Sequence, residues 1–373
     1  MRKLSDTIAR LGALKAQNAS YTAGNDCPPE NLATLLGFGS NPGVLQAKYY
    51  IPKHLPQGAP LVVVLHGCTQ TAAGYNHHSG WSELAEEEGF ALLFPEQQRT
   101  NNPNLCFNWF QPGDARRGSG EVLSIRQMID AMVLIHRLDR NRVFVTGLSA
   151  GGAMAAALLA SYPEVFAGGA IIAGLPFGSA TTISQAFDRM RGHGGPSHVV
   201  LQRALRGASD HQGPWPRISI WHGSADKTVV PSNAESMVGQ WRGVHKLDER
   251  PTYSKTTGVI AKQVWCDPSG DAVIEINMIA GIGHGTPIGD GLGVAGPYML
   301  DVGISSTREI ARFWRIAQSD GKATYVRSAS TAGKRPPPKP SDGSAVHRRH
   351  PASKGSGVQQ LIEDALRAAG LMR

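Results

Sequence analysis

The chain has 373 residues, of which 41% are hydrophobic and 18% are charged. This is an ordinary globular composition, and the length suffices for one large domain with a well-buried core. No apolar run approaches the length of a membrane span, so we expect no transmembrane segment. The formal net charge is +8. Residues 318–357 hold eight Lys/Arg against two Asp and carry most of that excess, so the charge does not predict specific nucleic-acid binding.

The first 43 residues precede the first expected strand. Leu4, Ile8 and Leu11 recur at helical spacing, which predicts a short amphipathic helix within an N-terminal helical extension, residues 1–43. Charged residues such as Asp6 interrupt the unbroken apolar stretch that a signal peptide needs. As written, the sequence therefore predicts a cytoplasmic protein.

Short apolar segments and helical patterns alternate from residue 44 to residue 317. Strand–helix alternation with fully apolar strands predicts an α/β catalytic domain with a mostly parallel central sheet flanked by helices. The expected strands are residues 44–52, 61–67, 90–97, 142–147, 168–174, 217–223 and 273–281, and the clearest helices are 81–89 and 120–138. In the longer helix, one apolar face is expected to contain Ile125, Met128, Ile129, Met132 and Ile135.

The composition changes after Trp314. Residues 318–357 contain PPPKP, many Ser and Gly and almost no large apolar residues, which predicts a basic disordered linker. Residues 358–373 carry an apolar stripe and predict a C-terminal amphipathic helix too short to be stable alone. The basic tail is a candidate contact for anionic surfaces. The sequence leaves the oligomeric state open.

A G-x-S-x-G motif supplies the candidate nucleophile. Ser149 stands between Gly147 and Gly151, after a buried strand and before an Ala-rich helix. In this strand–elbow–helix setting the serine sits at a sharp turn with its hydroxyl above the sheet. The helix N-terminus behind it favours developing negative charge.

The serine needs a histidine as base and an acid that orients it. In this fold the acid follows the serine in the chain, and the histidine comes last. Asp226, just beyond the strand RISIWHG, is the candidate acid; Asp267 and Asp271 compete but flank the expected hairpin turn DPSGD. His284 lies on a Gly-rich loop after the last expected strand and is the candidate base. His222 precedes Asp226 and is interpreted as structural.

An oxyanion hole requires two backbone N–H groups. We expect one from Ala150, directly after the nucleophile, and one from Cys68, in the loop after the strand LVVVL. Cys68 itself is not expected to be the nucleophile, because it lacks an elbow.

The four cysteines contain no C-x-x-C pair, so neither a zinc site nor a redox motif is expected. In a reducing cytosol four free thiols are the favoured interpretation, and one or two disulfides are the alternative for an exported protein.

Five segments resemble, in this order, the polyhydroxybutyrate (PHB) depolymerase family of esterases, which also includes feruloyl and acetylxylan esterases. They are HGCTQ, CFNWFQPGDARRGSGEVLSI, GLSAGGAM, WHGSADKTV and GIGHGTP, within residues 44–317. The resemblance implies an α/β-hydrolase fold, the triad and oxyanion residues named above, and a candidate disulfide between Cys68 and Cys106. Many members are secreted, which makes an extracellular location the alternative. One departure is Thr286-Pro287, where many members have Trp-Pro.

Two further groups have roles that the sequence leaves open. Trp109 is a candidate substrate-binding residue, with a packed surface loop as the equally weighted alternative. Asp114, Arg117 and Glu121 are expected to form a structural ion-pair cluster without a catalytic role.

These observations predict a serine esterase for short-chain hydroxyalkanoate esters, oligomeric or polymeric, that needs no metal or organic cofactor. A feruloyl or acetylxylan esterase is the first alternative. A non-catalytic protein that binds polymer granules or polyanions is the alternative of another class. A peptidase is disfavoured, because no large lid domain or propeller is present.

Overall fold

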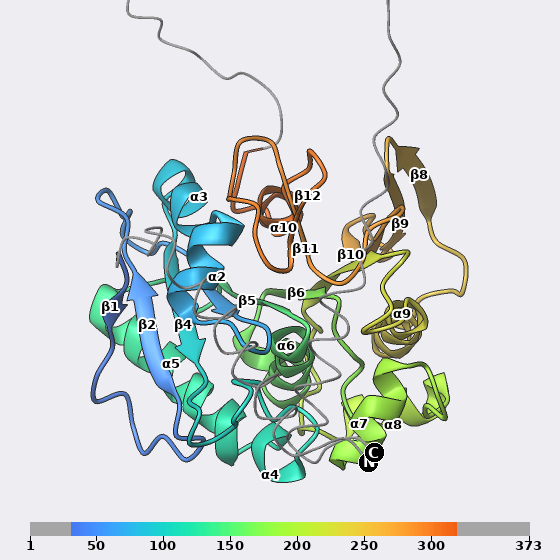
Figure 1. Cartoon of the computed structure of the whole chain (residues 1–373), viewed down its shortest axis with the longest axis horizontal. Coiled ribbons are helices and arrows are strands. Elements are labelled where there is room, and N and C mark those ends of the chain that lie inside the picture. The colour runs from blue at the N-terminus through green and yellow to red at the C-terminus, as the bar shows by residue number, and fades with distance from the viewer. Residues whose placement is uncertain (1–30, 319–373) are drawn as a thin grey trace, which may run out of the picture. The chain divides into compact units, whose positions relative to one another are not determined.

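The computed structural model describes residues 31–318 and centres on one ten-stranded sheet (Figure 1). The strand order is β1-β2-β4-β3-β5-β6-β7-β10-β9-β8, and the neighbours from β4 to β10 are parallel. The strands are β1 Ala33–Thr34, β2 Gln46–Tyr50, β3 Leu61–Leu65, β4 Ala91–Glu96, β5 Val143–Leu148, β6 Gly168–Ile172, β7 Arg217–Gly223, β8 Tyr253–Thr257, β9 Ile260–Cys266 and β10 Ala272–Ile279.

Helices cover both faces of this sheet, as the apolar strands predict. Leu61, Val63 and Leu65 of β3 pack with α5, α6 and α9, whereas Val62 and Val64 pack with α2, α3 and α10. Successive strand residues point to opposite faces, so each face has its own apolar core. The helices are α2 Ala72–Ser79, α3 Trp81–Glu88, α4 Pro112–Ala115, α5 Gly120–His136, α6 Ala150–Ser161, η1 Pro163–Val165, α7 Ile183–Met190, α8 His198–Arg206, α9 Ser232–His245 and α10 Ser306–Phe313.

The predicted mostly parallel sheet flanked by helices is confirmed, with antiparallel additions at both edges. β2 runs antiparallel to β4, and β8 and β9 form an antiparallel hairpin that continues antiparallel into β10. No pattern in the sequence predicted the hairpin of β8 and β9. All five residues of β8 are exposed, so it lacks the apolar signal of the central strands. A separate two-stranded sheet pairs β11 Thr286–Ile288 with β12 Met299–Asp301.

The sheet begins before residue 44, where the catalytic domain was expected to start. Ala33 and Thr34 pair with β2, and Leu32 and Leu35 are buried. Residues 31–43 therefore belong to the sheet domain, because β1 supplies backbone partners to β2. The helix expected near the N-terminus, the linker expected up to residue 357 and the final helix fall in residues 1–30 and 319–373, outside the described residues.

Helix α5 confirms the expected stripe with one exception. Ile125, Met128, Ile129 and Met132 are buried, but Ile135 is 57% exposed. Val133 is buried instead, so the buried face of α5 includes Val133 rather than Ile135 in the last turn. Among residues 31–318, no helix is long and apolar enough to cross a membrane.

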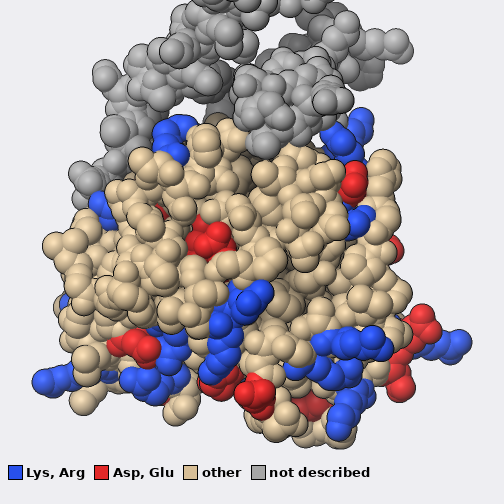
Figure 2. Space-filling model, turned by 90° about the horizontal axis from the view of Figure 1, so that it is seen from below, with Lys and Arg blue, Asp and Glu red and all other residues tan. Residues whose placement is uncertain are grey.

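Charges are unevenly distributed over one side of the sheet domain. Helix α4 follows the carboxyl end of β4, and α7 and α8 follow that of β6. Figure 2 views the molecule from the side on which these helices lie in Figure 1. Most Lys, Arg, Asp and Glu lie in the lower half of that view, and an acidic side chain lies near its centre.

Candidate active site

Ser149 occupies a strained turn between β5 and α6. Its backbone has φ 57° and ψ −116°, a conformation that a residue with a side chain rarely adopts. Two backbone bonds hold it: its N–H donates to the carbonyl of Ile172 on β6, and its carbonyl accepts from Ala153, both at 2.9 Å. The turn directs the chain from strand into helix at this serine, as the motif predicts.

The two motif glycines are required by close backbone contacts. A Cβ on Gly147 would lie 2.4 Å from the carbonyl oxygen of Gly151. A Cβ on Gly151 would lie 2.4 Å from the carbonyl oxygen of His66 and 2.5 Å from that of Leu65. These contacts fix the elbow and press the start of α6 against the end of β3.

Asp226, the candidate acid, is buried after β7 and fully hydrogen-bonded. Its Oδ1 accepts from the backbone N–H groups of Thr228 and Val229, each at 2.9 Å. Its Oδ2 lies 2.7 Å from Nδ1 of His284. The carboxylate therefore accepts a hydrogen bond from the Nδ1–H group of His284. In the neutral ring this places the lone pair on Nε2, which can then accept a proton.

The loop that carries His284 is fastened to the loop that carries the acid. The backbone N–H of Ala225 donates to the carbonyl of Ile282 at 3.0 Å, and that of Gly281 donates to Oγ of Ser224 at 2.9 Å. A Cβ on Gly223 would lie 2.4 Å from the Ile282 carbonyl oxygen. Acid and base thus form one hydrogen-bonded unit.

The sheet order places these groups at one edge. Ser149 follows β5, Asp226 follows β7 and His284 follows β10, and in the order β5-β6-β7-β10 all are parallel neighbours. Val229, next to the acid, packs with Ala153 of α6 in one apolar cluster. The carboxyl ends of parallel strands form one edge, so this arrangement suits nucleophile–base–acid chemistry.

The competing carboxylates lie elsewhere. Asp267 sits in the turn between β9 and β10, where its Oδ1 accepts from Ser269 and from the backbone of Asp271. His222 is buried beside the acid: its Nε2 lies 2.7 Å from the Val229 carbonyl and 3.5 Å from Oδ2 of Asp226. Burial lowers the pKa of His222, so this ring is neutral and supports the acid loop.

The expected oxyanion donors are both available. Within residues 31–318, the backbone N–H groups of Cys68 and Ala150 have no hydrogen-bond partner. Cys68 follows β3 by three residues and Ala150 begins α6, and the close contact between Gly151 and His66 brings these segments together. Two unpaired N–H groups near a serine can stabilise a tetrahedral oxyanion.

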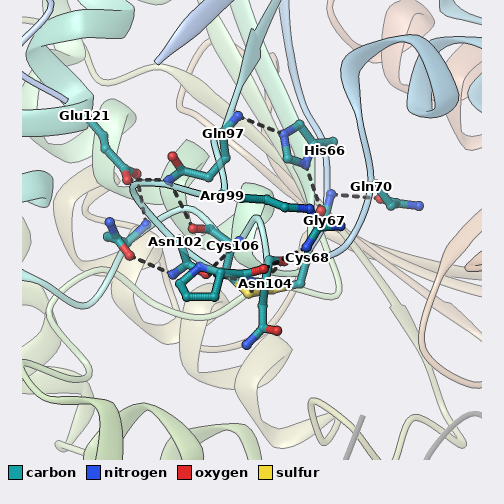
Figure 3. The surroundings of a disulfide bond; sticks show 12 residues. His66, Gly67, Cys68, Gln70, Gln97, Arg99, Asn102, Asn104, Cys106 and Glu121 are labelled. Carbon is teal, nitrogen blue, oxygen red and sulfur yellow. Dashed lines mark hydrogen bonds between the residues drawn. A yellow bond between two sulfur atoms is a disulfide. The ribbon is translucent and has the colours of Figure 1, made fainter. Parts of the chain in front are cut away.

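A disulfide joins Cys68 to Cys106 with an S–S distance of 2.10 Å (Figure 3). The favoured expectation of free thiols is thus wrong for these two cysteines, which the fold brings together from loops 38 residues apart. Cys266 is free, and Cys27 lies outside the described residues. The Thr69 N–H also donates to the Asn104 carbonyl at 2.7 Å, so the loops are joined twice.

The expected ion-pair cluster does not form. Arg117 pairs with Glu164 at 2.7 Å. Glu121 is instead buried, with Gln97 donating to its Oε1 at 2.6 Å and the Asn108 N–H donating to its Oε2 at 2.9 Å. Burial, reinforced by nearby Asp114, raises the pKa of Glu121 to about 8. Sequence reasoning missed this polar network; its signal was a carboxylate within the apolar stripe of α5.

Trp109 is half-buried against the nucleophile helix. It packs on the cluster formed by Ala153, Leu175 and Val229. Its ring meets Phe110 edge-on at 5.6 Å. Packing of this residue is thus observed, and its role in substrate binding stays a prediction. In the part of the chain that the structure describes, no group of three or more His, Cys, Asp or Glu residues is arranged to hold a metal ion.

The sequence and the fold of this chain are similar to those of known proteins. The sequence model of the family described as Esterase PHB depolymerase matches residues 45–256. Poly(3-hydroxyalkanoate) depolymerase C of Paucimonas lemoignei is 46% identical over 291 residues, which cover 76% of this chain and 70% of that protein. Acetylxylan esterase A of Emericella nidulans is 30% identical over 275 residues, 70% of this chain and 88% of that one. The solved acetyl xylan esterase from Aspergillus awamori has a similar fold, with a TM-score of 0.67 and 24% identity over 77% of this chain and 99% of that chain.

Proposed function

Because the chain belongs to the Esterase PHB depolymerase family, whose members here are carboxylic ester hydrolases of the α/β-hydrolase fold, we propose that it hydrolyses short-chain hydroxyalkanoate esters through an acyl-enzyme on Ser149. The observation that carries this proposal is the 2.7 Å contact between Asp226 and Nδ1 of His284, at the sheet edge where Ser149 occupies its elbow. A buried carboxylate on Nδ1 orients a histidine to act as a base through Nε2.

The proposed mechanism follows from these roles. His284 takes the Oγ proton as Ser149 attacks the ester carbonyl, and the Cys68 and Ala150 N–H groups stabilise the oxyanion. The tetrahedral intermediate collapses, the C–O bond to the alcohol breaks, and the alcohol leaves with the proton from His284. Water, deprotonated by His284, then releases the acid and restores Ser149. No step needs a metal or organic cofactor.

A polyester-type substrate is favoured by the relatives. The hydroxyalkanoate depolymerase is 46% identical, against about 30% for the acetylxylan esterases. A non-catalytic binding protein would not need a strained serine at the same sheet edge as a carboxylate-bound histidine.

An acetylxylan or feruloyl esterase is the second candidate, and the 30% identity to an acetylxylan esterase supports it. Thr286-Pro287 lies two residues beyond His284, so this departure from Trp-Pro concerns the substrate pocket rather than the catalytic chemistry.

The disulfide favours the extracellular alternative over the cytoplasmic expectation. Cys68–Cys106 joins two loops at the proposed oxyanion hole, and such bonds persist in oxidising compartments. Contact of the basic segment 318–357 with anionic surfaces remains part of the proposal.

A substrate panel tests the proposed function. p-Nitrophenyl butyrate, hydroxybutyrate oligomers, PHB film, acetylxylan and methyl ferulate are compared by kcat/KM, with Ser149→Ala as the inactive control. We expect hydroxybutyrate oligomers to be hydrolysed most efficiently. Preference for acetylxylan or ferulate would establish the second candidate, and Ser149→Ala with full activity would refute the mechanism.

A further inference from the structure

Tyr298 is an aromatic residue beside the candidate base that the proposed mechanism does not use. Its ring meets the imidazole of His284 in a T-shaped contact, with ring centroids 6.1 Å apart and ring planes inclined by 81°. The residue directly precedes β12, which pairs with β11, and its side chain is half-buried. A side chain that contacts the base lies within reach of the substrate on which that base acts.

The hydroxyl of Tyr298 is a free hydrogen-bond donor. Among residues 31–318 it has no hydrogen-bond partner, and burial raises the pKa of Tyr298, so the phenol keeps its proton at neutral pH. The buried Tyr75 differs, because its hydroxyl lies 3.1 Å from Oγ1 of Thr286. Half-buried donors are usually paired, so the hydroxyl of Tyr298 is available to a bound molecule.

The backbone of Tyr298 is held firmly, which gives its side chain a defined place beside the base. Its φ of 62° lies in the left-handed region that residues with a side chain rarely adopt. Its carbonyl accepts from the Thr286 N–H at 2.8 Å. A Cβ on Gly285 would lie 2.7 Å from the same carbonyl oxygen. Tyr298 is thus fastened to the two residues that follow His284.

The segment that carries Tyr298 also borders the proposed oxyanion loop. Nε2 of Gln70 lies 3.5 Å from the Pro297 carbonyl oxygen, and Oε1 of Gln70 accepts from the Gly67 N–H at 2.8 Å (Figure 3). Gly67 directly precedes Cys68, whose N–H is a proposed oxyanion donor. The segment therefore contacts both the base and the loop that is expected to bind the oxyanion.

Tyr298 and Trp109 belong to opposite faces of the sheet. Tyr298 packs on the apolar core that α2, α3 and α10 cover, whereas Trp109 packs on the core that α5, α6 and α9 cover. An ester likewise has two parts, the acyl group that Ser149 receives and the alcohol that leaves with a proton from His284. Because the leaving oxygen must reach the imidazole, the side chain in ring contact with that imidazole borders the alcohol part.

The alcohol part of a hydroxyalkanoate chain is the next hydroxyacid unit, and its own carbonyl lies a few bonds beyond the leaving oxygen. We propose that Tyr298 is a specificity-determining residue that donates its phenol O–H to the carbonyl of this leaving unit. A sugar hydroxyl, the alcohol part of acetylxylan, has no such carbonyl, so this bond favours polyester-type substrates. The inference rests on the proposed function and names the group that the site recognises.

Two esters with the same acyl group test this bond. One is the butyrate ester of methyl β-hydroxybutyrate, and the other is the butyrate ester of sec-hexyl alcohol, which has the same chain length but no carbonyl. Loss of one neutral hydrogen bond corresponds to about 3- to 10-fold in affinity. In Tyr298→Phe, kcat/KM should fall by about this factor on the first ester and stay within about two-fold on the second. The loss should lie mainly in KM, because the bond forms in the bound substrate as well as in the transition state.

Tyr253→Phe is the matched control. Tyr253 is an exposed tyrosine on the edge strand β8, and its hydroxyl also has no hydrogen-bond partner in the described part of the chain. This variant should keep wild-type kcat/KM on both esters. Partial unfolding of Tyr298→Phe would lower both values by the same factor, so the ratio of the two esters still decides.

The outcomes separate this inference from the proposed function. Equal loss on both esters, or any result in Tyr298→Phe other than a selective loss on the carbonyl-bearing ester, overturns the role of Tyr298 while the Ser149 mechanism stands. A wild-type protein that is inactive on both esters, or active independently of Ser149, overturns the proposed function itself.

Discussion

Replacing Asp226 by asparagine tests the acid by exchanging one acceptor atom for a donor. The amide oxygen can keep the two 2.9 Å bonds from Thr228 and Val229, so the acid loop should retain its conformation. The amide nitrogen then faces Nδ1 of His284, which must accept instead of donate. The proton moves to Nε2, the atom that must be free to take the proton of Ser149.

The expected cost follows from this wrong tautomer. By analogy with other serine triads, kcat should fall by about 10⁴, which corresponds to about 5 kcal/mol of transition-state stabilisation. The assay is hydrolysis of p-nitrophenyl butyrate, with thermal melting to verify folding. Asp267→Asn is the control, because that carboxylate only accepts bonds within its own turn. A large loss in Asp267→Asn together with a small loss in Asp226→Asn would refute the assignment of the acid.

Three other predictions concern the surroundings of the site. A Cys68→Ser/Cys106→Ser variant should lose about 4 kcal/mol of unfolding free energy, because the bond closes a loop with a sequence separation of 38. Its kcat should also fall. Chemical denaturation measures the first effect and kinetics the second, and unchanged values would contradict the role of the disulfide. The raised pKa of Glu121, about 8 in the folded state, means that the folded protein holds a proton that the unfolded chain releases, so stability falls as pH rises from about 4.5 to about 8. Melting temperatures of Glu121→Gln measured from about pH 5 to about pH 9 should lack this part of the fall. Parallel profiles of the variant and the wild type would contradict the prediction. Truncation after Ala317 should keep small-ester turnover within a few-fold while abolishing salt-sensitive retention on a polyanion, and a folded truncation without turnover would show that the tail belongs to the site.

The parts of the fold predicted from sequence were those with a local signal. The strand Val143–Leu148 and the Ala-rich helix after Ser149 are both buried along their whole length, so strand, elbow and helix are visible in adjacent residues. Asp226 and His284 could be chosen because each follows an apolar strand in the required order. Chain order and strand ends were sufficient to choose these two residues, and the structure brings their side chains to 2.7 Å from each other.

The parts that sequence could not give depend on partners distant in the chain. The hairpin of β8 and β9 mixes polar and apolar residues, and backbone pairing with β10 rather than burial defines it. Arg117 finds Glu164, 47 residues away, instead of Glu121 four residues away. Likewise, Nε2 of His66 lies 3.2 Å from the backbone N of Gln97, which no local pattern places beside it.

The arrangement of strands also has a mechanical consequence. Asp226 and His284 follow adjacent strands, β7 and β10, whereas β6 separates β5, which carries the serine, from β7. The elbow is tied to the end of β6 through the Ser149 N–H and the Ile172 carbonyl, and the next residue, Ala173, donates to the Trp221 carbonyl on β7 at 2.8 Å. The end of β6 therefore connects the candidate nucleophile to β7, the strand that precedes the candidate acid. We expect substitutions at this end of β6 to lower activity without changing a candidate catalytic side chain.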